Sequence, residues 1–147
     1  MTKPPSIARF EMLYWPAVVL GWLNSALNWR TSQAALDANP MLANVHWFLP
    51  VSAAVGALIS IAIWFFIARK ASVVAKWVQV VFAALGAIGI LTGIYTLVSG
   101  KAPSALAVVV VIVANVLYVA AATMLFKPDA KEWFGEGLDE DDSETLA

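Results

Sequence analysis

The sequence predicts an all-α fold: an integral membrane bundle of four helices that run alternately up and down. Of its 147 residues, 61% are hydrophobic and only 13% are charged, whereas soluble domains are about half apolar and about a quarter charged. Four apolar segments, 12–29, 47–68, 77–99 and 104–126, contain no Asp, Glu, Lys or Arg. Each is close to the roughly 20 residues that cross a bilayer as a helix. The short connections between the last three segments predict antiparallel neighbours.

The basic residues that flank these segments predict their orientation. Seven lie on one side of the predicted bundle and two, Arg30 and Lys101, on the other. Since lysine and arginine concentrate in cytoplasmic loops, both termini and the middle loop are expected in the cytoplasm. The first segment is longer than the apolar core of a signal peptide, and no clear A-x-A site follows it, so we expect it to be retained.

The chain divides into a bundle, residues 1–134, and an acidic tail, residues 135–147. Eight of the ten acidic residues fall in the last nineteen positions. Pro128 is expected to end the fourth helix, and DAKEWF to form one or two turns that place Trp133 and Phe134 in the membrane interface. The tail is expected to be disordered. It either keeps the chain soluble or docks on a basic surface of a partner.

Two asparagines lie four residues apart in the stretch GWLNSALNW. Asn24 and Asn28 therefore share one face of the first helix. An unpaired amide in hydrocarbon is costly, so this face should turn toward the other helices, where Asn115 and Tyr118 of the fourth segment are candidate partners. The ordinary interpretation is interhelical hydrogen bonding that holds the bundle together. The alternative is a polar pocket or pore lining.

Tryptophans and small residues mark two further kinds of surface. Trp15, Trp22 and Trp29 are spaced seven apart and share a helix face, which we interpret as a candidate partner face because Trp22 falls in mid-span. Small residues recur every four positions and predict close helix packing or a homodimer face. They are Ser52, Gly56 and Ser60 in the second segment and Gly89 and Gly93 in the third. The fourth segment, apolar all round except at its Asn and Tyr, is expected to face mainly lipid.

The sequence shows no enzyme or metal-site motif, so any catalysis would need a cofactor or a partner chain to supply the chemistry. It has no cysteine and one histidine, His46, so paired haem ligands and histidine–cysteine metal sites are excluded. No nucleophile triad or phosphate-binding loop is present. No carboxylate lies within a span, and Glu11, at the start of the first, is best explained by the helix dipole, with transport as the alternative. No basic patch with interleaved aromatics indicates nucleic acid.

Both ends of the chain resemble a group of small bacterial four-span proteins of unknown function. The motifs are LYWPAVVLGWLN, the basic loop IARKASVVAKWVQ and the ending LFKPDAKEWF, which is similar to a recurring Leu-Phe-x-Pro-x-Ala-x-x-Trp-Phe pattern; the acidic extension departs from it. The resemblance implies a bacterial inner-membrane location and four helices, but no activity.

Together, these features favour a non-enzymatic accessory or structural subunit that associates with itself or with a larger membrane complex. The expected partners are the lipid bilayer and a protein or a second copy, with no cofactor and no nucleic acid. The alternative is a small oligomeric transporter or pore lined by the intramembrane asparagines.

Overall fold

A computed structural model describes residues 3–41, 44–102 and 104–136. All the regular elements in these residues are helices, which confirms the predicted all-α class. In chain order they are α1 (Pro5–Leu27), α2 (Trp29–Asp37), α3 (Phe48–Lys70), α4 (Val73–Val98), α5 (Ala105–Met124) and α6 (Pro128–Trp133). Pro103 and the acidic tail from residue 137 onward lie outside the described residues.

Local sequence signals explain the helix boundaries. The hydroxyl oxygens of Ser72 and Ser104 accept hydrogen bonds of 3.3 Å from the N–H groups of Ala75 and Ala107, so each serine caps the helix that follows. α3 ends where Ala71 takes a left-handed conformation with φ 49°. Pro128 occupies the first turn of α6, where its missing N–H costs nothing.

Three of the described helices are long and apolar enough to cross a membrane. They are α3, α4 and α5, with mean hydropathies of 2.3, 2.1 and 2.6 over their best windows. α1 has the same 23-residue length as α3 but does not meet this criterion. It begins at Pro5 rather than at the predicted residue 12, so it includes Arg9 and Glu11. The structure thus shows three candidate spans where the sequence predicted four.

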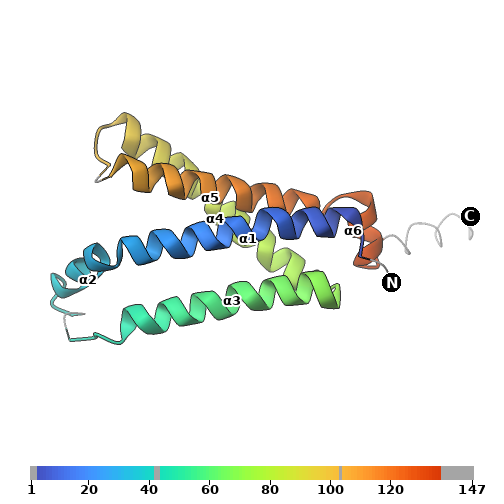
Figure 1. The fold of residues 1–147 in the computed structure, drawn as a ribbon, viewed down its shortest axis with the longest axis horizontal. Coiled ribbons are helices and arrows are strands. Elements are labelled where there is room, and N and C mark those ends of the chain that lie inside the picture. Colours follow the sequence, from blue (N-terminus) through green and yellow to red (C-terminus); the bar gives the residue numbers. More distant parts are fainter. Residues whose placement is uncertain (1–2, 42–43, 103, 137–147) are drawn as a thin grey trace, which may run out of the picture.

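α5 is the central helix of the molecule. It packs along both α1 and α4, which are its most extensive neighbours (Figure 1). The sequence predicted that this segment faces mainly lipid. Its alanines explain the difference, because Ala114, Ala121 and Ala122 are buried and allow neighbouring helices to approach closely.

α3 joins the other helices at only one end. We call the end where α1 begins, α5 ends and α6 lies the terminal end, and the opposite one, near α2, the loop end (Figure 1). The buried residues of α3 are Ile63, Ile67 and Ala68, all near the terminal end, whereas its loop half is almost wholly exposed. The long helices alternate in direction, but a closed four-helix bundle is not confirmed.

The hydrophobic core accordingly lies at the terminal end. Its large side chains include Phe10 and Tyr14 of α1, Ile67 of α3, and Leu125 and Phe134, which directly follow α5 and α6. The short segment DAKEWF is helical, as predicted. Phe134 is 7% exposed and packs in this core rather than standing in the membrane interface as expected.

Candidate functional site: cavities around the loop half of α1

Three cavities surround the loop half of α1. The central cavity, 390 Å³, is lined by α1, α3, α4 and α5. The tryptophan cavity, 510 Å³, lies between α1, α2 and α3, and the glycine cavity, 710 Å³, lies between α1, α4 and α5. Trp22 and Ser60 line both the central and the tryptophan cavity, and Asn24 lines both the central and the glycine cavity. The three cavities therefore adjoin one another through shared lining residues.

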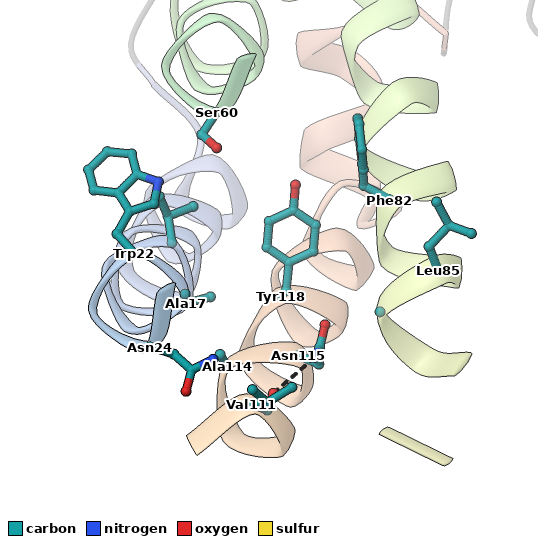
Figure 2. Close-up of a pocket in the computed structure, with 13 residues that line it drawn as sticks. Ala17, Trp22, Asn24, Ser60, Phe82, Leu85, Val111, Ala114, Asn115 and Tyr118 are labelled. Atoms are coloured by element: carbon teal, nitrogen blue, oxygen red, sulfur yellow. Dashed lines mark hydrogen bonds between the residues drawn. The ribbon is translucent and has the colours of Figure 1, made fainter. Parts of the chain in front are cut away.

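The central cavity brings together polar residues from three helices. Asn24 comes from α1, Ser60 from α3, and Asn115 and Tyr118 from α5. Figure 2 shows Tyr118 projecting from α5 into the space between α3 and α4, with Phe82 on the α4 side. The structure thus places three of the four predicted polar residues around one cavity, and Asn28 lines the adjoining glycine cavity.

The polar side chains of these cavities hydrogen-bond within their own helices. Asn28 Nδ2 donates to the main-chain oxygen of Asn24 at 2.8 Å and to its Oδ1 at 3.0 Å. Asn115 Nδ2 donates to the oxygen of Val111 at 2.9 Å, the dashed line in Figure 2. The sequence favoured interhelical bonds for these asparagines; in the described residues their bonds are intrahelical. Asn24 lines both the central and the glycine cavity, and its Nδ2 donates no hydrogen bond to a described residue.

The glycines of α4 pack closely on α5. A Cβ built at Gly93 would lie 3.0 Å from Ile112 Cγ1, and one at Gly86 only 2.7 Å from Asn115 Oδ1. Gly89 also lies beside Asn115. The corresponding stripe of α3 is different, since Ser52 and Gly56 are exposed and a Cβ at Gly56 would meet nothing within 4 Å. Close packing is therefore present at α4, while the α3 stripe lines the open tryptophan cavity.

The predicted tryptophan face is directed toward α3. Trp15 packs against Trp64 of α3 with ring centroids 5.4 Å apart. Trp22 and Trp29 line the tryptophan cavity and are 39% and 37% exposed. Trp15 thus packs within the chain, whereas Trp22 and Trp29 keep exposed surface that a partner could contact.

Two tyrosines connect the central cavity to the core at the terminal end, since Tyr118 lines the cavity and packs against the core in which Tyr14 is buried. The hydroxyl of Tyr14 donates to the main-chain oxygen of Ser60 at 2.8 Å, and its ring lies 5.5 Å from that of Tyr118. Gln79 lies beside Tyr118 and is fully buried. Its side-chain nitrogen and oxygen make no hydrogen bond of standard geometry with a described residue.

Glu11 has a structural role at the terminal end. Its carboxylate accepts a hydrogen bond of 2.9 Å from Trp64 Nε1 and forms an ion pair of 2.6 Å with Lys3. It therefore ties α1 to α3 and does not line any of the three cavities. His46 is exposed, and in the described part of the chain no three His, Cys, Asp or Glu residues could hold a metal ion together.

Sequence reasoning missed three contacts that organise the terminal end. Lys76 is buried and paired with Glu136, Asp129 accepts from the Ser6 N–H, and Trp133 Nε1 donates to the oxygen of Ile67. A lysine in the first turn of an apolar helix resembles any flanking charge of a span. The sequence signal that could have indicated these contacts is the ending LFKPDAKEWF. It places a helix-ending proline, a carboxylate and two aromatic side chains within ten residues.

What the cavities can do chemically follows from their lining. None of their lining residues is Asp, Glu, Lys, Arg or His. They can offer amide and hydroxyl hydrogen bonds, aromatic surface and small residues for close packing. Tyr118 is the one ionisable side chain among these lining residues.

The three apolar helices define the chain as a small helical membrane protein. The chain matches no protein-family model, and no curated protein or solved structure shows significant similarity to it.

Proposed function

We propose that this is a non-enzymatic subunit that works by assembly, receiving a transmembrane helix of a partner in the open side of α3. The partner is another copy of the chain or a subunit of a larger membrane complex. The observation that carries the proposal is the tryptophan cavity, where Ser52, Gly56 and Ser60 form a stripe of small residues and no described residue packs against Gly56 at its middle.

Membrane physics explains why such a stripe favours a helix as the occupant. Lipid tails are as apolar as leucine, so helices associate through close packing and polar contacts, and small residues let their backbones approach. Trp22 and Trp29 border the same cavity and would supply large contact surfaces. A partner helix would also cover the hydroxyls of Ser25 and Ser52, which otherwise face hydrocarbon.

We further propose that α1 is a fourth span and that the chain lies in a bacterial inner membrane with both termini in the cytoplasm. α1 packs along the spanning helix α5 and is as long as α3. The mean hydropathy of α1 is lowered by Asn24, Tyr14 and Trp15. Tyr14 and Trp15, however, pack against aromatic rings of α5 and α3 rather than against lipid. The seven-to-two distribution of flanking basic residues supports the orientation.

Native purification in a mild detergent, with the mass of the intact particle, tests the assembly. Gly56→Leu should reduce the particle to a monomer, because the new side chain fills the space that the partner helix would occupy. Trp22→Leu should weaken assembly as well. Val55→Leu, a change at an exposed residue outside the cavity lining, is the matched control. A wild-type particle that contains one chain and nothing else contradicts the proposal.

The second candidate function is passage of a small neutral polar solute. The observation that favours it is the convergence of Asn24, Asn115 and Tyr118 on one uncharged cavity. Flux into liposomes should then fall in Asn24→Leu and Asn28→Leu. Flux that is unaffected by both substitutions would remove the asparagines as its lining.

A further inference from the structure

α6 and the residues after it cover the terminal end of the molecule. We call residues 128–136 the terminal lid. The lid contacts each neighbouring long helix through one polar bond: Asp129 accepts from the Ser6 N–H of α1 at 3.0 Å, and Trp133 Nε1 donates to the Ile67 oxygen of α3 at 3.0 Å. On α4, Glu136 pairs with Lys76 at 2.5 Å. A short segment thus holds three helices together.

The Lys76–Glu136 pair is unequal in its exposure. The side chain of Lys76 is only 2% exposed, whereas that of Glu136 is 29% exposed. Lys76 Nζ also lies 4.7 Å from the ring centroid of Phe126 and 5.2 Å from that of Phe134. A buried ammonium is costly unless it is paired, so the carboxylate of the lid stabilises a charge that cannot reach water while the lid is closed.

A buried polar strip continues beneath the lid. Gln79 lies one turn after Lys76 on the same face of α4 and is fully buried, and its side chain makes no hydrogen bond of standard geometry with a described residue. Tyr118, beside Gln79, lines the central cavity. The lid therefore separates water at the terminal end from a strip of polar groups that leads toward the cavities.

The connection to α5 has the features of a hinge. After Met124 the helix ends in turns, where the N–H groups of Phe126 and Lys127 make long hydrogen bonds of 3.3 and 3.4 Å. Pro128 then prevents α5 from continuing. Gly135 has φ 73°, a left-handed conformation that glycine adopts without strain and that turns Glu136 back toward α4.

We propose that the terminal lid is a releasable gate, locked by the Lys76–Glu136 pair, and that its release opens the polar strip of α4 to water. This inference does not depend on the proposed assembly function. It predicts an asymmetry: Glu136→Gln strands a buried cation and opens the lid, whereas Lys76→Met leaves a carboxylate that water already reaches.

Cysteine labelling tests the gate, since the chain has no cysteine of its own. Single cysteines replace Ala130 on the lid and Ala68 beneath it, both buried, and Ala114 in the middle of α5 serves as the control reporter. The full chain in membrane vesicles with the terminal side outward is treated with an impermeant maleimide. Glu136→Gln should speed labelling at positions 130 and 68 at least tenfold and leave position 114 unchanged.

Two further variants separate the lock from a general loss of stability. Glu132→Gln changes another exposed carboxylate of the lid, for which the structure shows no ion pair with a described residue, and should leave labelling at its wild-type rate. Lys76→Met with Glu136→Gln removes the stranded cation and should bring labelling back toward that rate. Unchanged labelling in Glu136→Gln, or equal acceleration at position 114, would overturn the proposal.

Discussion

The hydroxyl of Tyr14 joins α1 to the main chain of α3. Its ring is fully buried, and the hydroxyl donates to the Ser60 oxygen at 2.8 Å. Tyr14→Phe keeps the ring and removes this bond. We expect it to lower the free energy of unfolding by about 0.5–1.5 kcal/mol, because hydrogen bonds between membrane helices contribute modestly. Unfolding in mixed micelles measures the change. Tyr95→Phe, at a 62% exposed ring, is the control and should be neutral.

The Asp129 carboxylate gives the terminal end a dependence on pH. The backbone N–H of Ser6 donates to it and, as the largest cause, holds its pKa below the ordinary 3.8. A lowered pKa means that the carboxylate contributes stability above about pH 3.8, and that this contribution is lost as the pH falls through the lowered value. Wild-type unfolding midpoints should therefore fall in acid more steeply than those of Asp129→Asn.

Comparison at neutral pH completes this test. Asp129→Asn should already be less stable than wild type there, since an amide oxygen is a weaker acceptor than a carboxylate. Asp37→Asn removes a carboxylate in α2, far from the terminal end, and should keep the wild-type profile (Figure 1). Parallel acid profiles for wild type and Asp129→Asn would show that the contact with Ser6 has no part in acid stability.

At the scale of elements, hydropathy predicted where the helices are better than how they pack. The segments 47–68, 77–99 and 104–126 correspond to α3, α4 and α5. A helix that is apolar on every side gives no periodic signal of the face it buries. The sequence therefore could not show that α5 is central or that the loop half of α3 stands apart.

Single residues within these elements show the same limit. Gly93 and Gly56 belong to equivalent stripes, yet only Gly93 meets a neighbouring helix. Asn24, Asn115 and Tyr118 were predicted as one polar group, and the structure places them around one cavity. Lys76 was counted only as a flanking charge, because its burial depends on a lid more than fifty residues away in sequence.

The α4–α5 interface can be tested at its closest approach. Gly93→Leu should lower the free energy of unfolding by about 1–3 kcal/mol, because added atoms must displace Ile112 and Val108 in a packed interface. Gly21→Leu is the matched control on α1, where a Cβ meets nothing within 4 Å. A smaller loss at Gly93 than at Gly21 would contradict the packing described for α4 and α5.

The whole molecule poses the question of whether α1 crosses the membrane with α3, α4 and α5. Four spans place the two ends of the chain on the same side, whereas three place them on opposite sides. α1 begins beside the end of α5, and the Asp129 bond to Ser6 joins the two termini of the bundle. We expect green fluorescent protein fused to either terminus to fluoresce, since both fusions would fold in the cytoplasm.

Alkaline phosphatase fusions provide the reciprocal measurement, because this enzyme is active only after export. A fusion within the 30–46 connection should be active and one at the Ala71–Ser72 connection inactive, since these connections lie at opposite ends of α3. An N-terminal fluorescent fusion that is dark beside a bright C-terminal one would make α1 a helix outside the bilayer core. The asparagines of α1 would then face water rather than membrane, and the cavities around it would lose their meaning as sites for a transmembrane helix.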